Sequence, residues 1–353
     1  MIVKKLAVLA SMAVLQCTLA SAPAVAQSSN SCYASFTYCV GDTWPIPPES
    51  QCPNPMGIPY VCLLCTVASN KCQAICWDCL LGTPKGGEPI NLANGNTFIT
   101  QSDLTIPGLG GGLSLSRTWN SQFPFGEAVP TSGMFGGNWR STYEDLIFVD
   151  SQGLVKYVRG TGGIWTLGLS GLGNLDTYSM IAPANENVSV AYNGTSWTLS
   201  FNTGEKRIFL IKNPNVPPWI GTLTSIIDRN GNTTNLTYDI VGRLTTVTDP
   251  ASRHLYFSYA GDLVVGVSSD AGISLSYAYD NLGRLTTVTK PDLTTVSFQY
   301  DSQSMISAVL DTNGKVLEAH TYDGMLRGLT SSRANGVDAI TVTYPFLIPN
   351  ELP

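Results

Sequence analysis

The C-terminal part of the chain is patterned for β-strands. Residues 273–279 alternate apolar and small positions as Ile-Ser-Leu-Ser-Tyr-Ala-Tyr, and residues 234–238 do the same as Thr-Asn-Leu-Thr-Tyr. A period of two is typical of a strand with one buried face. Thr, Val, Tyr, Ile and Leu fill these runs, while Asn, Asp, Gly and Pro separate them. The pattern predicts an all-β structure of short antiparallel strands joined by tight turns.

The same region repeats itself. Tyrosines recur at spacings of 20 to 22 residues, namely Tyr238, Tyr259, Tyr279, Tyr300, Tyr322 and Tyr344. Four are followed by aspartate, which gives Asp239, Asp280, Asp301 and Asp323. Two units continue with Gly-Arg-Leu and then Thr-Thr-Val-Thr, in which the first three residues are Gly242, Arg243, Leu244 and Gly283, Arg284, Leu285. Each unit has room for two strands and two turns, so neighbouring units must stack into one sheet.

The Tyr-Asp pairs favour a structural role. A carboxylate beside a phenol could perform acid–base chemistry, but four near-identical copies do not make one asymmetric active site. We expect the aspartates to accept turn amides and the tyrosines to bury their rings at strand ends. Asn-Gly pairs within residues 228–231 and 311–314 predict two further hairpin turns. His254 and His320 fall in different units without a pattern typical of a triad or a metal site.

The first 26 residues have the pattern of a secretory signal peptide. Lys4 and Lys5 precede an apolar run at residues 6–15, and Ala-Val-Ala at 24–26 predicts cleavage before Gln27. Acylation of Cys17 is the less favoured alternative, because Gln16 precedes it where a small residue is preferred. No later run reaches the length of a membrane-spanning helix. We therefore expect an exported protein, secreted or at the cell surface, that is not an integral membrane protein after cleavage.

A cysteine-rich module follows the signal. Eight of the nine cysteines lie between residues 32 and 79. An even number of cysteines in a short, proline-rich segment of an exported protein predicts a disulfide framework. The pairing is open, and the candidates are Cys32, Cys39, Cys52, Cys62, Cys65, Cys72, Cys76 and Cys79. Two Cys-x-x-Cys pairs keep a structural zinc site as the alternative.

Composition narrows the classes of function. The chain of 353 residues has a net charge of −6 and only 12% charged residues, which argues against nucleic acid as a partner. It contains two histidines, so acid–base and metal chemistry have few candidate residues. No glycine-rich nucleotide loop or nucleophile motif is present, and we expect neither a cofactor nor an enzymatic activity.

The segment before the repeats resembles a known family. Residues 86–96 read Gly-Gly-Glu-Pro-Ile-Asn-Leu-Ala-Asn-Gly-Asn, similar to the opening of the domain that precedes the repeats in RHS (rearrangement hotspot) proteins. Residues 104–110, residues 115–121 and the Gly-Asn-Trp at 137–139 followed by Tyr143 continue this resemblance. The downstream Tyr-Asp and Gly-Arg-Leu units resemble the YD repeats of the same family.

The resemblance implies a fold and a context. RHS and YD-repeat proteins wind a β-sheet into a hollow shell, and many bacterial members enclose a C-terminal toxin. The self-cleaving aspartate motif of those members is missing here, so the resemblance implies the fold without the toxin or protease activity. The expected fold is a twisted, spiralling open sheet forming part of such a shell, truncated relative to full-length members.

These observations divide the chain into a signal peptide at 1–26, a Cys-rich module at 27–83, a pre-repeat β domain at 84–220, YD repeats at 221–344 and a tail at 345–353. The first functional hypothesis is a non-enzymatic part of a toxin-delivery shell, whose partners would be a toxin domain or further RHS repeats. The alternative is a free-standing carbohydrate-binding or adhesion module that uses surface aromatics such as Trp165 or Trp197 on a cell-surface glycan. In both cases the last strand is expected to present an unpaired edge that recruits another chain.

Overall fold

The computed structural model describes most of the chain after residue 89. The described ranges are 90–92, 94–123, 132–150, 152–172, 175–182, 186–211 and 220–344, with short strands at 65–66, 71–72 and 85–86. The predicted signal peptide, the predicted tail and most of the Cys-rich module lie outside them. Within the module, β1 (Cys65–Thr66) and β2 (Lys71–Cys72) pair antiparallel with Cys65 opposite Cys72.

The described residues form antiparallel strands and two single 3-10 turns, which confirms the predicted all-β class. They divide into two compact units. From residue 77 onward, the first takes residues 146–158 and 163–222, and the second takes 77–145, 159–162 and 223–353. The predicted pre-repeat segment at 84–220 is thus divided between the two units. Its first part belongs with the repeats, because it supplies the cover for their sheet.

The first unit is a closed ring of eight strands, which we call the strand ring. Its strands are β10 (Leu146–Val149), β11 (Val155–Val158), β12 (Ile164–Gly171), β13 (Asp176–Ala182), β14 (Val188–Tyr192), β15 (Ser196–Phe201), β16 (Lys206–Ile211) and the start of β17 (Gly221–Ile227). Each strand pairs with the next, and β17 pairs back to β10 through Leu146–Thr222 and Ile147–Gly221. A Cβ on Gly221 would lie 2.7 Å from Ile147, so the closing strand fits only without a side chain there.

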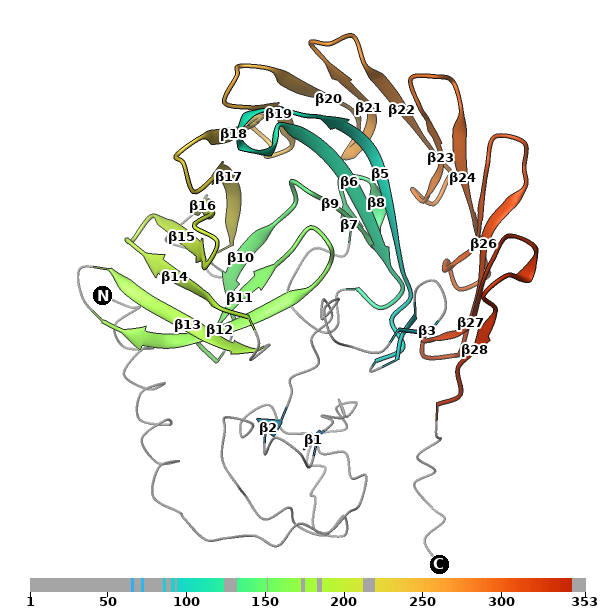
Figure 1. Cartoon of the computed structure of the whole chain (residues 1–353), viewed down its shortest axis with the longest axis horizontal. Helices are drawn as coiled ribbons and strands as arrows, with labels where there is room; N and C mark the ends of the chain where they lie inside the picture. The colour runs from blue at the N-terminus through green and yellow to red at the C-terminus, as the bar shows by residue number, and fades with distance from the viewer. Residues whose placement is uncertain are drawn as a thin grey trace, which may run out of the picture. The chain divides into compact units, whose positions relative to one another are not determined.

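The second unit contains the repeat sheet, coloured from yellow to red in Figure 1. After β17 its strands are β18 (Thr233–Tyr238), β19 (Leu244–Thr248), β20 (His254–Ala260), β21 (Leu263–Ser269), β22 (Ser274–Tyr279), β23 (Leu285–Thr289), β24 (Thr295–Tyr300), β25 (Ile306–Leu310), β26 (Val316–Tyr322), β27 (Gly328–Arg333) and β28 (Ile340–Thr341). They pair in sequence order as one antiparallel meander. The predicted strand-turn-strand repeat and its open sheet are therefore confirmed in this unit.

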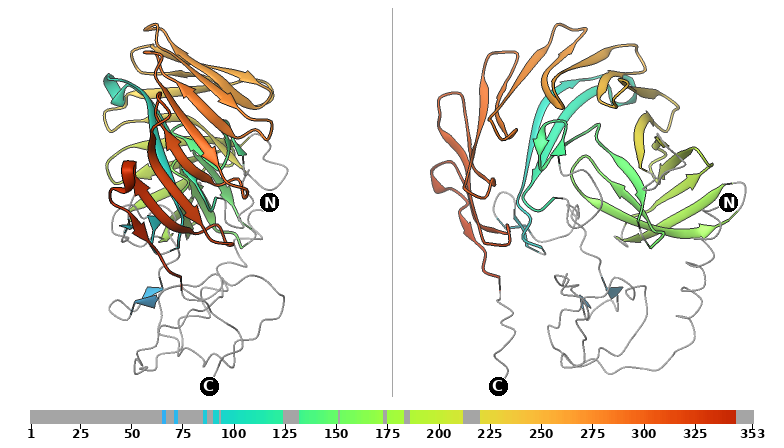
Figure 2. Two further views of the ribbon diagram at one scale, coloured as in Figure 1. Left: turned by 90° about the vertical axis from the view of Figure 1, so that its right-hand side faces the viewer. Right: turned by 180° about the vertical axis from the view of Figure 1, so that it is seen from behind.

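A smaller sheet covers one face of the repeat sheet, which we call the inner face. It consists of β5 (Phe98–Ile106), β6 (Leu113–Asn120) and β9 (Trp139–Ser141). The short pair β3 (Lys85–Gly86) with β4 (Ile90–Asn91) precedes it in sequence, and the pair β7 (Ser132–Gly133) with β8 (Gly136–Gly137) lies between β6 and β9. Trp139 meets Phe298 at 5.1 Å and Phe135 meets Tyr277 at 4.8 Å between ring centroids. Figures 1 and 2 show β5 and β6, in teal, along the repeat sheet.

Candidate functional site: the repeat ladder and the buried seam

Nine turns of the repeat sheet share one backbone geometry. In each, the amide of the first residue donates to the carbonyl of the fifth, and the amide of the fourth donates back to the carbonyl of the first. These turns begin at Asp228, Asp239, Asp249, Ser269, Asp280, Lys290, Asp301, Asp311 and Asp323. Successive hairpins alternate between the two ends of the strands, so this turn occurs at both ends. The repeating backbone element is therefore one strand and one turn, half the length of the sequence repeat.

The aspartate at the first position of a turn accepts hydrogen bonds from the backbone amides of that turn. Asp239 Oδ1 accepts hydrogen bonds from the amides of Gly242 and Arg243, both at 2.8 Å. The hydrogen bond from the Arg243 amide is the largest cause that lowers the pKa of the Asp239 carboxyl. In the same way, Oδ1 of Asp280, Asp301 and Asp323 accepts the amides two and four residues further on. These carboxylates are committed to the backbone, as proposed for Asx turns.

The fourth residue of the turn has a left-handed backbone. Gly242 and Gly283 have φ of 95° and 73°, a region that glycine adopts without a steric penalty. Ser304 and Leu326 stand at the equivalent positions with φ of 64° and 62°. The Gly of the Gly-Arg-Leu motif therefore adopts this backbone without strain. The units that have Ser304 or Leu326 at the same position are strained there.

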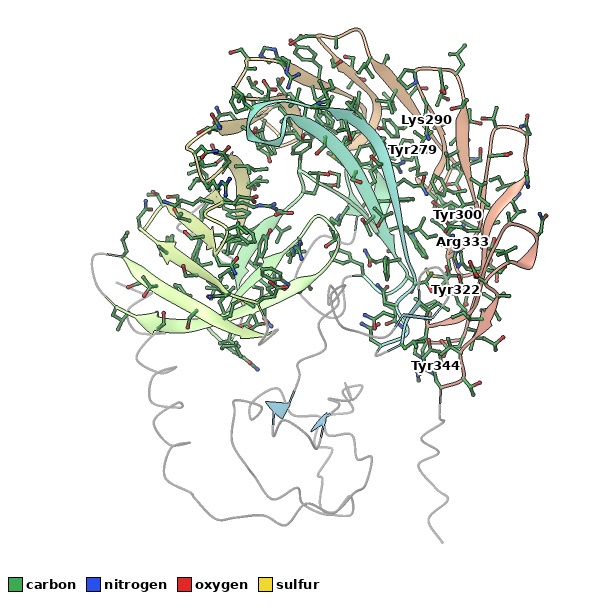
Figure 3. The ribbon with its side chains drawn as sticks, viewed as in Figure 1. Tyr279, Lys290, Tyr300, Tyr322, Arg333 and Tyr344 are labelled. Atoms are coloured by element: carbon green, nitrogen blue, oxygen red, sulfur yellow. The ribbon has the colours of Figure 1, made fainter. Side chains whose placement is uncertain are left out.

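The repeat tyrosines form a ladder across the sheet. Tyr238 Oη donates to the carbonyl of Leu223 at 2.6 Å, and Tyr300 Oη donates to that of Leu285 at 2.8 Å. Tyr259, Tyr279, Tyr322 and Tyr344 donate in the same way to carbonyls 15 or 16 residues earlier. Burial raises the pKa of Tyr300 to about 12. Figure 3 shows Tyr279, Tyr300, Tyr322 and Tyr344 in line along successive repeats.

The repeat arginines join each unit to the next. Arg243 Nε donates to Asp239 of its own turn at 2.8 Å, while its guanidinium lies 5.0 Å from the ring centroid of Tyr259. Arg284 lies 4.7 Å from the ring of Tyr300 in the same arrangement. Arg327 likewise lies 4.1 Å from the ring of Tyr344, so the cation–π contact always connects one unit to the tyrosine of the following unit. Leu244 and Leu285, which follow the arginines, are buried in the sheet.

The interface between the covering sheet and the repeat sheet contains a buried ion pair, which we call the seam. Arg117 Nη2 donates to Asp103 Oδ1 at 2.8 Å, and both side chains are almost fully buried. Tyr277 Oη donates to the other Asp103 oxygen at 2.9 Å. The Arg117 guanidinium also lies 4.7 Å from the ring of Trp139. Burial opposes the charge on Arg117, but Asp103 outweighs it and raises the pKa of the guanidinium.

A second buried carboxylate lies in the same unit. Glu144 accepts the amides of Met134 at 2.6 Å and Ser141 at 2.8 Å. Its burial raises the pKa of the carboxyl against the opposing charge of Arg140. A buried carboxyl with a raised pKa can serve as a general acid, but here both oxygens hold backbone amides. The arrangement fixes the loop before β10.

The two histidines have separate environments. His254 lies at the start of β20, with Nδ1 2.7 Å from Asp270 Oδ2. His320 is buried in β26, where Nε2 lies 3.5 Å from Glu318 Oε2. Among the described residues, no group of three or more His, Cys, Asp or Glu side chains is placed to hold a metal ion. In the same part of the chain, no helix has the length and apolar character needed to cross a membrane.

The prediction that Trp165 and Trp197 are surface aromatics is wrong. Their exposed fractions are 3% and 2%. Trp165 packs against Tyr157 at 5.7 Å and Trp197 against Tyr178 at 5.6 Å, inside the strand ring. Both lie in alternating strands, and the alternation alone does not indicate which face of each strand is buried.

Sequence reasoning also missed the seam. Arg117 occupies the same alternating phase as Leu113, Leu115 and Trp119, all buried. An arginine in the apolar phase of a strand was the available signal for a buried, paired cation. Its partners Asp103 and Tyr277 come from elements separated by 174 residues, which the sequence pattern does not bring together.

Two family models match the chain. A domain of unknown function (DUF6531) matches residues 87–166, and the RHS Repeat model matches residues 220–254 and 259–295. No curated protein matches significantly.

Several solved structures have detectable similarity at low scores. One is a TcdB2-TccC3-Cdc42 crystal structure, at 14% identity and TM-score 0.27, covering 55% of this chain and 13% of that one. A second is the N-terminal domain of effector protein SpvB from Salmonella typhimurium strain LT2, at 12% identity and TM-score 0.31, covering 60% of this chain and 98% of that one. A third is the Photorhabdus luminescens Tc holotoxin pore, at 12% identity and TM-score 0.24, covering 57% and 16%.

Scores this low do not establish a shared arrangement of strands, and the chain spans about an eighth of the first of these structures. The family models carry the assignment, since both the DUF6531 segment and the repeats are matched in the expected order. The chain therefore contains RHS repeats that follow a DUF6531 segment.

Proposed function

We propose that this chain is a non-enzymatic, exported RHS-repeat scaffold that forms part of a toxin-delivery shell or is an accessory to one. The RHS Repeat match supports a shell-related role. The observation that carries the non-enzymatic part is the commitment of the Tyr-Asp carboxylates to turn amides, as in Asp239 and Asp280. A carboxylate that accepts hydrogen bonds from the amides of its own turn has a structural role in the sheet. The partner of such a scaffold is a toxin domain or further RHS repeats.

The edge of the repeat sheet supports a role in assembly. β28 pairs with β27 through only two residue pairs, Thr330–Thr341 and Ser331–Ile340. β28 is the last strand of this sheet among the described residues, and none of the described strands pairs with its outer side, where another strand can add.

The test uses the protein in its native cells. After chemical crosslinking, the protein is purified from the surface and culture fractions, and its mass and crosslinked partners are determined. We expect a form that begins at Gln27 and is joined in stoichiometric amount to a toxin domain or to further RHS repeats. Cells that lack the gene are the control. An unprocessed protein inside the cell, or an exported monomer without a partner, contradicts the proposal, and turnover that survives repurification contradicts its non-enzymatic part.

A second candidate function is a cell-surface carbohydrate-binding module. One observation favours it. The outer face of strands β18–β22 has no Lys, Arg, Asp or Glu within the strands, is rich in Ser and Thr, and carries one exposed tyrosine, Tyr256. Hydroxyls around an aromatic ring suit a neutral, polar ligand with one flat face.

A further inference from the structure

Tyr256 differs from the other aromatic residues of the described chain. In β20 the side chains of Leu255 and Phe257 are buried on the inner face, so Tyr256 points to the outer face, where it is 43% exposed. The other described Tyr, Trp and Phe side chains are buried or half-buried. An exposed aromatic ring contributes little to the core and can instead contact a ligand.

The Tyr256 ring is held in one orientation. Its Oη donates to Asp270 Oδ1 at 2.9 Å, and the other oxygen of Asp270 accepts from the His254 amide at 2.8 Å and lies 2.7 Å from His254 Nδ1. The rings of His254 and Tyr256 stack at 5.5 Å with an interplanar angle of 18°. One side of the tyrosine ring thus faces His254, and the other remains available. We call these three residues the Tyr256 platform.

The register places hydroxyl groups beside this platform. Tyr256 lies opposite Thr246 on one side and Ser268 on the other. The next strands continue the row with Thr237 and Ser274. The charge nearest to the ring is that of Asp270, and its two oxygens are already engaged by His254 and Tyr256.

These features narrow the class of ligand. A nucleic acid would need basic side chains for its phosphates, and strands β18–β22 contain neither Lys nor Arg. An apolar peptide would need apolar neighbours around the ring, and the register supplies Thr and Ser. A pyranose sugar has an apolar face for the ring and hydroxyls at its rim for Thr and Ser.

We propose that the Tyr256 platform is a binding site for a neutral pyranose unit of a glycan. The sugar ring stacks on the free side of Tyr256, and its hydroxyls exchange hydrogen bonds with Thr246, Ser268 and His254 Nε2. Asp270 acts as a positioning residue, because it fixes both rings before the sugar binds and so reduces the entropic cost of binding. This inference rests on the second candidate function and assigns it a site.

The test measures glycan binding by the full mature chain. The protein is applied to an array of bacterial and eukaryotic surface glycans, and the affinity for the best neutral glycan is then measured by calorimetry. We expect Tyr256→Ala to weaken this binding at least tenfold. Asp270→Asn should weaken it less, by roughly threefold, since it loosens the platform without removing the ring. Gln299→Ala, at another exposed position on the outer face, is the matched control and should bind like the wild type.

The outcomes separate the site from the function. Circular dichroism and the unfolding midpoint establish that each variant is folded. Binding that Tyr256→Ala leaves unchanged overturns this site while the carbohydrate-binding function stands. Equal losses in Tyr256→Ala and Gln299→Ala also overturn it, because they indicate a non-specific effect. The absence of binding to every glycan overturns both the site and the second candidate function.

Discussion

The strand ring and the repeat sheet differ in how they cover an apolar sheet face. Both are antiparallel meanders with one apolar face, and both must deal with that face and with their sheet edges. The ring closes on itself through β10 and β17 and fills its interior with its own aromatics, including Tyr157 and Trp165. The repeat sheet stays open and relies on a separate segment, β5, β6 and β9, to cover its inner face.

The difference teaches where stability resides in each unit. In the ring, side chains from several strands share one core, so damage at one strand affects its neighbours across the interior. In the repeat sheet, each turn is held locally by its own aspartate, and each arginine contacts the next tyrosine. Stability there is closer to a sum of unit and neighbour terms. The seam is the exception, because it connects the sheet to a distant segment.

The largest expected effect is at the seam. Arg117→Ala leaves Asp103 buried without its cation, so we expect a loss of about 3–5 kcal/mol in the free energy of unfolding of the repeat unit. Urea denaturation gives the loss, and hydrogen exchange assigns it to peptides of the repeat sheet. In Asp103→Leu/Arg117→Met/Tyr277→Phe the pair and the Tyr277 hydroxyl that donates to Asp103 are all replaced by apolar groups, and most of the stability should return.

Glu205→Gln provides the matched control in the strand ring, where the Glu205–Arg207 pair is half-exposed. We expect it to cost about 1 kcal/mol or less. A similar loss at both sites would mean that the seam is an ordinary ion pair, and the contrast between a shared interface and local devices would fail.

The next effect concerns a single turn. Asp280→Ala removes the acceptor for the amides of Leu282 and Arg284, and we expect a loss of about 1–2 kcal/mol, as for other side chains that cap backbone amides. Hydrogen exchange should increase in β22 and β23 and remain unchanged in β18 and β19. Asp292→Ala is the comparison, since Asp292 Oδ1 accepts one turn amide, that of Thr294, together with the Thr294 hydroxyl at an exposed site, and we expect a smaller loss than in Asp280→Ala. Faster exchange throughout the sheet would contradict local stability.

The fourth position of the turn gives a smaller effect. Gly283→Ala places a Cβ at φ 73°, and we expect a loss of about 1 kcal/mol from backbone strain, because its nearest neighbour, Leu263 Cδ1, lies at an ordinary contact distance of 3.7 Å. Gly324→Ala, in an open turn position without positive φ, should be neutral or slightly stabilising. Thermal unfolding of the two variants compares them directly. Equal midpoints would mean that these turns do not require the left-handed conformation.

The smallest expected effect is that of acid on the turn aspartates. The pKa values of Asp239, Asp280 and Asp323 are lowered in the folded protein. A lowered folded-state pKa contributes stability above the ordinary carboxyl value of 3.8, and this contribution is lost as the pH falls through the folded value. We expect the urea midpoint of the repeat unit to fall progressively below about pH 4. In Asp280→Ala this decline should be shallower, and an identical decline would assign the acid sensitivity to other groups.

The sequence predicted much of the repeat sheet because its information is local. The Tyr-Asp spacing and the alternation around Leu275 and Tyr277 place strands and turns within a few residues of one another. The sequence also places turns at Asp249 and Lys290, but it does not predict that these turns and the one at Ser269 share the geometry of the Tyr-Asp turns, because the shared feature is the backbone and the residue at the fourth position varies.

The remaining features depend on distant contacts. Nothing near residues 146–149 indicates that they pair with β17, about 70 residues later, so the closed ring could not be predicted. The burial of Trp165 and Trp197 follows from that closure. Asp270 contributes to the Tyr256 platform through cross-strand register, which the sequence pattern does not specify.

The position of the covering segment in the chain has a consequence for folding kinetics. During synthesis β5, β6 and β9 emerge before the repeats, and contacts such as Asp103–Tyr277 form only after 174 further residues. Until then Trp119, Trp139 and Arg117 lack the sheet that buries them. Contacts of this sequence separation slow folding and prolong the exposure of apolar surface. The nascent chain should therefore need a chaperone after β5, β6 and β9 have been synthesised and before the repeats that cover them have emerged. It should aggregate most readily when elongation pauses in that interval.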